Sequence, residues 1–396
     1  MTRRLLAPLA PALAALTLAS AAAAAPADPP WRAAQEIQDG LFAAQSGLIL
    51  DPPAVARREV ERAARGYRGP LRRSIAAADP AADRAVRQGL RQAAAAAAAG
   101  DDVALAAARG AVRAGVLRGA YAATLEAVEA DRASAARSWL LLREFRTATR
   151  FTRPGADGTL AVERLAHGEE RPARAAATVR KDLLDAYQAR LRELLDDAVR
   201  GAEHGLPVRV AEAAAQAEGY FAILAPRYEH DRGAAETEKA TNAFAALRAA
   251  AIEGASPARI AELEHSAAAT LEGFTAAPFT PAEAARRAQQ LLRFVALVPV
   301  EYGRGVSDDR VTKDFEIQEA AAFHKGGAAA LADLQAQLAR RSPREAAVAG
   351  REMRRLGALV QGAVDHPGRV ASADEVEHTG DAADKALRAA MPDAWE

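Results

Sequence analysis

The chain has 396 residues, with 52 basic and 52 acidic side chains, so its formal net charge at pH 7 is zero. Without a net charge, the chain as a whole does not attract nucleic acid or an anionic membrane. It contains no cysteine, which excludes disulfides, thiolate metal sites, iron–sulfur clusters and cysteine nucleophiles. Any metal site must use oxygen or imidazole ligands, and oxygen-rich ligand sets suit hard cations.

The first 25 residues have the features of a secretory signal peptide. Arg3 and Arg4 form a short basic region, residues 5–18 are largely apolar, and an alanine run ends at Ala25. A basic region, an apolar core and a small-residue cleavage site are the parts of such a peptide. The apolar core is short for a membrane span, so an uncleaved anchor is the weaker alternative. We therefore expect residues 1–25 to be removed and the mature protein to be periplasmic or otherwise extracytoplasmic.

From Trp31 onward the sequence predicts a succession of amphipathic helices separated by glycine, proline and aspartate. Alanine dominates the composition and is the best helix former. No convincing series of strands follows from the pattern. We predict an all-α fold of stacked helical hairpins that form one or two helical bundles. An Ala/Arg-rich helical region is expected at residues 26–135, and a second helical domain at residues 136–396.

Two helix starts are marked by their capping residues. Ser256 and Thr280 each precede a proline, which places a hydroxyl at the N-cap and proline at the first helical position. Glu283 follows Thr280 at the spacing of a capping box. These signals locate helices and carry no information on function.

Arginines recur at helical spacing between Trp139 and Pro154, and Glu144 is the only acidic residue among them. The four arginines are Arg143, Arg146, Arg150 and Arg153. One interpretation is an anion site or a contact for an acidic helix. The other is a helix whose arginines form salt bridges with neighbouring helices, and the sequence favours it because arginine commonly packs its stem along apolar surface.

The sequence contains no motif of a known catalytic site. It has no nucleophile elbow, no phosphate-binding loop, no dinucleotide fingerprint and no H-E-x-x-H. Two E-x-x-H motifs, at Glu262–His265 and Glu375–His378, have the spacing of di-iron ligands in helical bundles. Glutamate is so frequent here that such spacings arise by chance. We therefore do not expect an enzyme.

The most distinctive segment of the chain is residues 291–326, where bulky apolar, aromatic and acidic residues replace the alanine-rich pattern. If the chain is helical after Asp309, Glu316 and Glu319 lie on one face. Gly303 and Gly305 would let the preceding residues fold back onto that helix. We predict a metal site for a hard cation at this place. Its expected ligands are Glu301, Tyr302, Asp314, Glu316 and Glu319.

A purely structural interpretation of the same residues stays open. Glu301 would pair with Arg304 or Arg310, and the acidic residues at the helix start would interact favourably with the helix dipole. Spacing alone favours this second interpretation.

Four segments resemble the extracytoplasmic N-terminal region of bacterial FTR1-type high-affinity iron permeases. They are residues 139–160, 179–191, 217–228 and 291–323, and the resemblance extends from Trp139 to the terminal MPDAW. It implies a part in iron uptake. The family handles iron through R-E-x-x-E motifs in its transmembrane helices. The nearest strings here, at Arg143-Glu144 and Arg192-Glu193, lack the second glutamate.

No stretch after the signal peptide is long and apolar enough for a transmembrane helix, so we expect the chain to correspond to the extracytoplasmic region, either free-standing or from a split gene. The resemblance implies an iron-uptake component that binds iron, as Fe²⁺ or Fe³⁺, or delivers it to a membrane iron permease. The carboxylate ligands named above are inferred from spacing and not from the family. The alternative is a helical scaffold that binds no metal and docks onto a membrane transport partner. No nucleic-acid partner is expected.

Overall fold

The computed structural model describes residues 29–50, 53–144 and 157–395. The predicted signal peptide lies outside these residues. The described part contains fifteen α-helices and one hairpin of two-residue strands, so the predicted all-α fold of stacked helical hairpins is confirmed. Among the described helices, none combines the length and the apolar character that a membrane span requires.

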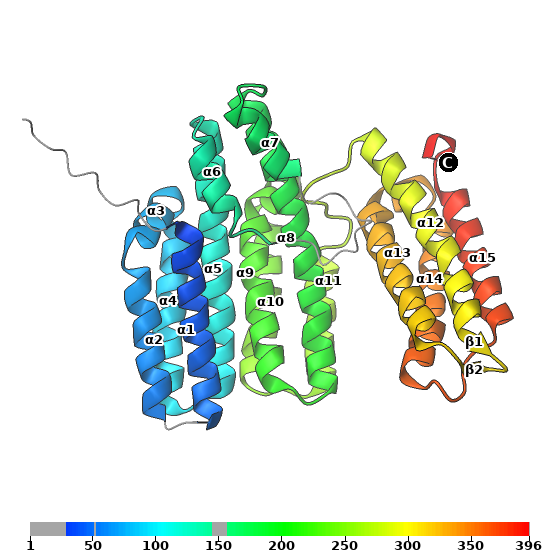
Figure 1. Cartoon of the computed structure of the whole chain (residues 1–396), viewed down its shortest axis with the longest axis horizontal. Coiled ribbons are helices and arrows are strands. Elements are labelled where there is room, and N and C mark those ends of the chain that lie inside the picture. The colour runs from blue at the N-terminus through cyan, green and yellow to red at the C-terminus, as the bar shows by residue number, and fades with distance from the viewer. Residues whose placement is uncertain (1–28, 51–52, 145–156, 396) are drawn as a thin grey trace, which may run out of the picture.

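The first group of helices lies at one end of the molecule (Figure 1). Its members are α1 (Pro30–Leu50), α2 (Pro53–Tyr67), α3 (Pro70–Ala78), α4 (Pro80–Ala99), α5 (Asp102–Glu129) and α6 (Ala133–Leu140). Proline and an aspartate cap fix the start of α4, because the Asp79 carboxylate accepts hydrogen bonds from the backbone N–H groups of Ala81 and Ala82. Glycines let α4 and α5 approach closely. A Cβ atom at Gly89 would come within 2.7 Å of Val112.

The second group continues the same layered body. Its members are α7 (Asp157–Ala166), α8 (Pro172–Glu203), α9 (Pro207–Arg232), α10 (Ala234–Ile252) and α11 (Pro257–Thr270). Helix α5 packs on α4 and on α9, so it joins the two groups (Figure 1). An aromatic cluster fills the core here, in which the rings of Phe221 and Phe244 stack 4.8 Å apart and Tyr228 packs edge-on against Phe221.

The third group is a separate four-helix bundle at the opposite end of the molecule (Figure 1). It contains α12 (Pro281–Gly305), β1 (Val306–Ser307), β2 (Arg310–Val311), α13 (Asp314–Arg341), α14 (Pro343–Asp365), α15 (Ala373–Ala390) and the short 3₁₀ helix η1 (Asp393–Trp395). The capping box predicted at Thr280 and Glu283 opens α12. Leu291, Leu334 and Leu387 are fully buried in the bundle core.

Polar contacts on α8 connect the bundle to the larger body. The side chain of Gln188 donates to the backbone carbonyl of Phe274 and accepts from the N–H of Ala276, which holds the connecting segment against α8. Lys181 forms a salt bridge with Glu283 at the start of α12. These contacts are charged or polar, as is common where two domains of one chain meet.

Candidate metal centre

A tight hairpin brings the end of α12 against the start of α13. Val306 pairs with Val311 and Ser307 with Arg310 in antiparallel register. Asp308 and Asp309 form the turn with φ angles of 49° and 54°, the left-handed conformation that two-residue hairpins require. The reversal therefore occurs at these aspartates. We expected it at Gly303 and Gly305, but both remain inside α12.

Gly305 has a different role, which is to let the two helices approach closely. A Cβ atom there would come within 2.7 Å of the Ile317 side chain and 3.2 Å of the Glu316 Cβ. Its carbonyl oxygen accepts hydrogen bonds from the backbone N–H groups of Thr312 and Lys313, at 2.8 and 3.2 Å. The last turn of α12 is thereby fixed against the first two turns of α13.

Three of the predicted ligands converge at this contact. One carboxylate oxygen each from Glu301, Glu316 and Glu319 lie within 4.8 Å of one another. Oxygens that share a hard cation at about 2.1–2.5 Å lie no more than about 5 Å apart, so this separation fits a shared ion. Glu301 is buried, with 6% of its surface exposed, and the other two are half-buried.

The structure also contains the ion pair between Glu301 and Arg304 that the alternative, purely structural interpretation predicts. Arg304 Nη1 lies 3.1 and 3.0 Å from its two carboxylate oxygens. The Arg304 side chain is 60% exposed, so it can turn into solvent. Neither Glu316 nor Glu319 forms a salt bridge with a residue that the structure describes. Only Glu301 of the three carboxylates therefore has a guanidinium partner among the described residues, which leaves an excess of negative charge.

Tyr302 and Asp314 lie outside this cluster, although we predicted both as ligands. Tyr302 follows Glu301 by one residue, so its side chain projects about 100° around the helix and is buried in the bundle. Its hydroxyl donates to the Ala371 carbonyl oxygen at 3.0 Å. Burial raises the pKa of Tyr302, and the carboxylates of Glu375 and Asp309 add to the rise, so the phenol stays protonated at neutral pH. Asp314 is exposed two residues before Glu316, and residues at that spacing do not share a helix face.

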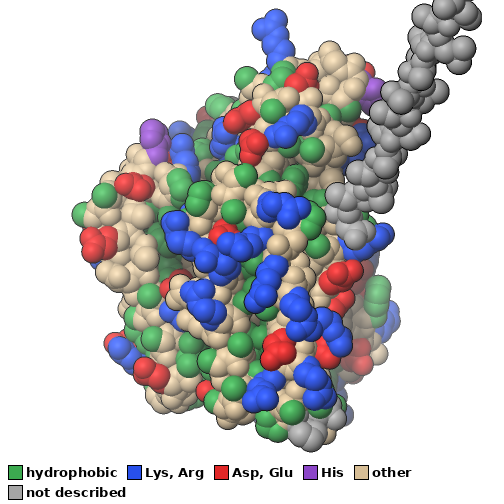
Figure 2. Space-filling view, turned by 90° about the vertical axis from the view of Figure 1, so that its left-hand side faces the viewer, with side chains coloured by type: hydrophobic (Ala, Val, Ile, Leu, Met, Phe, Trp, Pro, Cys, Tyr) green, Lys and Arg blue, Asp and Glu red, His purple; other side chains and the backbone are tan. Residues whose placement is uncertain are grey.

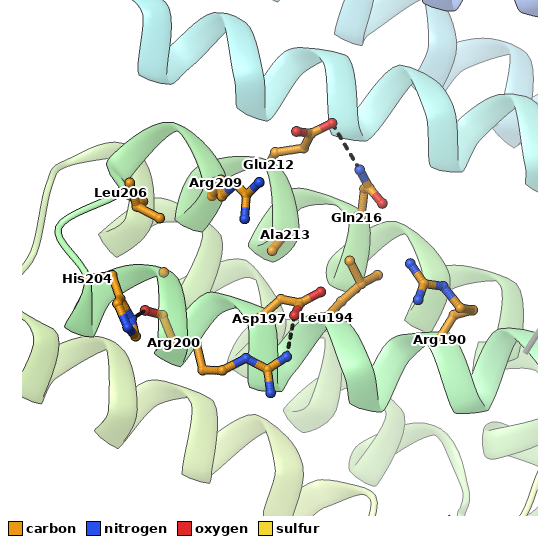
Figure 3. Close-up of a pocket in the computed structure, with 11 residues that line it drawn as sticks. Arg190, Leu194, Asp197, Arg200, His204, Leu206, Arg209, Glu212, Ala213 and Gln216 are labelled. Carbon is orange, nitrogen blue, oxygen red and sulfur yellow. Dashed lines mark hydrogen bonds and ion pairs between the residues drawn. The ribbon is translucent and has the colours of Figure 1, made fainter. Parts of the chain in front are cut away.

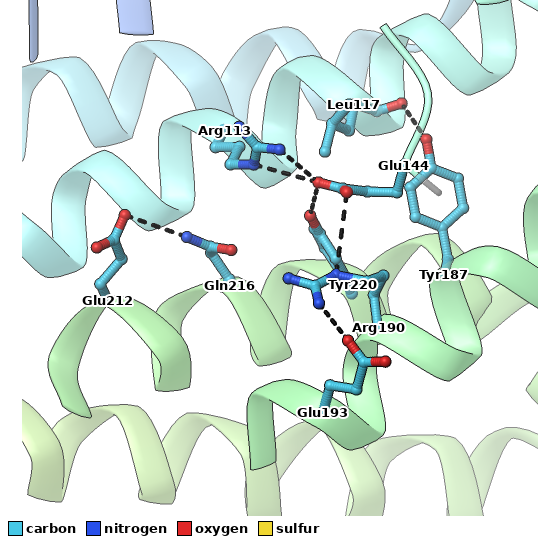
Figure 4. A network of polar contacts seen from close by, with 9 residues as sticks. All are labelled: Arg113, Leu117, Glu144, Tyr187, Arg190, Glu193, Glu212, Gln216 and Tyr220. Carbon is cyan, nitrogen blue, oxygen red and sulfur yellow. Dashed lines mark hydrogen bonds and ion pairs between the residues drawn. The ribbon is translucent and has the colours of Figure 1, made fainter. Parts of the chain in front are cut away.

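A second polar centre, which the sequence did not reveal, lies between α5, α8 and α9 (Figure 4). Glu144, in the segment that follows α6, accepts hydrogen bonds from the Tyr220 hydroxyl and from Arg113 Nη2, each at 2.6 Å. Arg190 Nε lies 3.9 Å from its other oxygen. Tyr187 lies beside the network and donates to the Leu117 carbonyl oxygen at 3.4 Å.

The charges of this network compensate one another. Burial alone would raise the pKa of Glu144, but Arg113, the Tyr220 hydrogen bond and Arg190 lower it below its usual value. Burial, followed by the Glu144 carboxylate, raises the pKa of Tyr220, so its hydroxyl remains a donor. Each acidic group has a cationic or hydroxyl partner. The network ties three helices together and leaves no free ligand.

In the described part of the arginine-rich segment the structural interpretation is supported only in part, because α6 ends at Leu140 and the residues that follow, up to Glu144, are not helical. Glu144 is bridged to neighbouring helices, and Arg143 donates to the Thr159 hydroxyl at 2.7 Å. Arg146, Arg150 and Arg153 lie outside the described residues. No spacing rule could have found the network, because its members come from four distant places in the chain.

A pocket of about 490 Å³ lies between α8 and α9, next to this network (Figure 3). Its charged side chains are largely paired. Arg200 contacts Asp197 at 2.5 Å, and Glu212 pairs with Arg109 of α5 and accepts from Gln216. The Nδ1 atom of His204 lies 2.7 Å from the Arg200 carbonyl oxygen. The pocket therefore offers little uncompensated charge to a ligand.

Comparison with known families accounts for almost all of the described chain. The family described as the iron permease FTR1 N-terminal domain matches residues 27–271. The chain belongs to the FTR1 iron permease family. The iron permease-associated 4-helix bundle domain matches residues 280–394. Neither the search of curated proteins nor that of solved structures found a match.

The family domains coincide with the architecture described above. Helices α1 to α11 form the FTR1 N-terminal domain, and α12 to α15 form the associated four-helix bundle, which begins at its N-cap Thr280. The similarity includes the Ala/Arg-rich region before Trp139, where the sequence alone showed no resemblance. The domain boundary near residue 135 stays a prediction. The converging carboxylates lie in the FTR1-associated bundle.

Proposed function

We propose that this FTR1-family chain binds iron through Glu301, Glu316 and Glu319 and delivers it to a membrane iron permease. Membership of the family implies a function related to iron permeation. The observation that supports the proposed ligands is the convergence of three carboxylates at a fixed helix contact, where among the described residues only Glu301 has a guanidinium partner, Arg304. Delivery, like the extracytoplasmic location predicted from residues 1–25, is part of this proposal.

Carboxylate ligands suit iron. Carboxylate oxygens are hard ligands, and a cluster with excess negative charge attracts a cation of charge two or three. Iron binding would displace Arg304 from one or both Glu301 oxygens. Hard cations usually take six or more oxygen ligands, so three glutamates leave positions for water or for the ligands of a receiving protein. Transfer by ligand exchange needs no covalent chemistry and no change of oxidation state.

The alternative function is a scaffold that binds no metal and docks onto a membrane transport partner. One observation favours it, namely that Glu301 already has an ion-pair partner in Arg304. In that case Glu316 and Glu319 would serve as acidic residues near the start of α13, where the helix dipole favours negative charge.

Calorimetric titration with ferrous iron under anaerobic conditions, and with ferric iron buffered by nitrilotriacetate, separates the two functions. We expect the double variant Glu316→Gln and Glu319→Gln to lose at least about two orders of magnitude in affinity, since two of three charged ligands are lost. The matched control is Glu345→Gln and Glu352→Gln, which neutralises two half-buried glutamates on α14 of the same bundle.

Equal loss of affinity in both double variants would indicate a general charge effect and contradict the assigned ligands. Absence of iron binding by the unaltered protein would remove the metal function. Capture of a membrane permease by a protein that binds no iron would favour the scaffold.

A further inference from the structure

Positive charge is concentrated in one short part of the chain. Residues 53–91 contain ten arginines and four carboxylates, a net charge of +6. The whole chain has no net charge, so the remaining residues together carry −6. The zero net charge of the whole chain is therefore the sum of a basic region and an acidic remainder. The expectation that the chain does not attract anionic partners does not hold for the basic region.

Helix α2 presents its arginines away from the core. Its inward side chains, such as Val60 and Tyr67, are fully buried at helical spacing. The arginines of α2 lie outside this buried stripe, and all of them are exposed. They are Arg57, Arg58, Arg62 and Arg65, and Arg68 in the turn after α2 is exposed as well.

Helices α3 and α4 extend the same surface. Val86 and Leu90 of α4 face the core, while Arg84 and Arg91 are exposed on the opposite side, each about one turn from Arg87. Arg73 is exposed on α3. Helices α2 and α4 pack against each other, and the view onto this end of the molecule shows basic side chains over much of it (Figure 2). We call the exposed surface formed by the arginines of residues 53–91 the basic face.

Most of these charges lack an internal partner. Arg62 and Arg65 pair with glutamates of their own helix, and Arg72 and Arg87 pair with Asp83. The other six form no salt bridge with any residue in the described ranges. They are Arg57, Arg58, Arg68, Arg73, Arg84 and Arg91. Six unpaired guanidinium groups on neighbouring helices can therefore meet an external anion.

The basic face lacks the apolar anchors of a protein interface. Among described residues, none of the exposed large hydrophobic side chains lies between residues 53 and 91. Protein–protein interfaces usually bury aromatic or aliphatic side chains at their centre. A surface of phosphate groups needs only charge and N–H donors, and the planar guanidinium donates two parallel hydrogen bonds to a phosphate.

We propose that the basic face binds anionic phospholipid headgroups and holds the protein on a membrane surface. The basic face and the candidate metal centre lie at opposite ends of the long axis (Figure 1), so this proposal does not depend on iron binding. Docking would be electrostatic and therefore weakened by salt, because the interaction is screened beyond a Debye length.

Co-sedimentation with vesicles tests the proposal. The purified protein is mixed with vesicles of phosphatidylcholine that contain phosphatidylglycerol, and separately with pure phosphatidylcholine vesicles, which report any uptake through the apolar N-terminal segment. We expect binding to the anionic vesicles only, and its loss at high salt. Each basic residue near an anionic surface strengthens binding roughly fivefold, so the variant Arg58→Gln, Arg68→Gln, Arg84→Gln and Arg91→Gln should bind about 600-fold more weakly.

The matched control removes the same charge elsewhere. It carries Arg340→Gln, Arg341→Gln, Arg344→Gln and Arg351→Gln, four exposed arginines at the α13–α14 end of the bundle. We expect this control to bind anionic vesicles nearly as well as the unaltered protein. Equal loss in both variants, or no binding to anionic vesicles at low salt, would overturn the proposal. Tighter binding to polyglutamate or duplex DNA than to vesicles would also overturn it, in favour of an acidic protein or a nucleic acid.

Discussion

Glu144 in the FTR1 N-terminal domain and Glu301 in the four-helix bundle are shielded carboxylates with similar nearest partners. The exposed fraction of the side chain is 11% for Glu144 and 8% for Glu301, and each contacts an arginine. Tyr220 donates to Glu144, whereas the tyrosine next to Glu301 donates to a backbone carbonyl. Around Glu144 the cations and donors match the acid. Around Glu301 two further carboxylates converge, and the exposed Arg304 pairs with Glu301 alone.

The difference shows how a buried acidic residue can be assigned a role. A carboxylate whose charge is fully compensated stabilises the fold, and its removal leaves cations without a partner. A carboxylate among other carboxylates raises the energy of the folded protein until a cation arrives. Burial and a nearby arginine do not distinguish the two cases, but the balance of positive and negative charge around the carboxylate does.

The largest expected effect is on stability at Glu144. Replacing Glu144 by alanine should lower the free energy of unfolding of the N-terminal domain by about 3 kcal/mol, because Arg113 and Tyr220 lose their shared partner, whereas Arg190 keeps Glu193. This loss is at the low end of what removal of one partner of a buried ion pair costs, because Arg113 is partly exposed. Glu301→Ala should cost less than about 1 kcal/mol, since Arg304 can turn into solvent and like-charge repulsion is relieved.

Urea unfolding followed by tryptophan fluorescence measures both changes. Trp139 lies in the N-terminal domain and Trp395 in the bundle, and both are largely buried, so variants that retain only one of these two, with Trp31 replaced in both, report each domain separately. Equal destabilisation by Glu144→Ala and Glu301→Ala would remove the distinction between the two sites.

Removing the hydroxyl of Tyr220 should also destabilise the protein more than removing that of Tyr302, but the difference should be smaller than that between the two glutamates. Tyr220→Phe removes a hydrogen bond to a carboxylate and should cost about 2 kcal/mol, whereas Tyr302→Phe removes one to a neutral carbonyl and should cost about 1 kcal/mol. The same fluorescence measurement compares them. A larger loss for Tyr302→Phe would indicate that the Glu144 network is not the stronger of the two.

Arg304 provides a test specific to the bundle. Arg304→Gln should change stability by less than about 1 kcal/mol, because the arginine is exposed. The same change should raise iron affinity roughly tenfold, since a competing cation leaves the ligand oxygens. The paired measurements are thermal unfolding and calorimetric titration with iron. Weaker iron binding by this variant would argue against Glu301 as a ligand.

The smallest expected effect is a pH dependence of the N-terminal domain. The pKa of Glu144 is lowered by folding, so its contribution to stability is complete above the usual glutamate pKa, about 4.3, and is lost as the pH falls through the folded value. Stability of this domain should therefore decline with acidification more steeply in the unaltered protein than in Glu144→Gln. Identical dependence of stability on pH in the two proteins would show that the charge of Glu144 does not contribute to stability.

Local signals in the sequence were sufficient for the helices and for part of the site. Thr280 with Glu283 located the start of α12, and the spacing of Glu316 and Glu319 placed them on one face. The turn was assigned to glycines because they favour left-handed backbone, whereas Asp308 and Asp309 adopt that conformation here. The Glu144 network could not be predicted, because its partners are set by tertiary packing of α5, α8 and α9.

Diffraction from crystals soaked in iron, recorded on both sides of the iron absorption edge, shows directly whether Glu301, Glu316 and Glu319 hold iron. The account predicts an anomalous peak at the α12–α13 contact, within about 2.0–2.3 Å of oxygens from Glu301, Glu316 and Glu319. An iron peak at another place, with Arg304 still bound to Glu301 and no density between the three carboxylates, would contradict it.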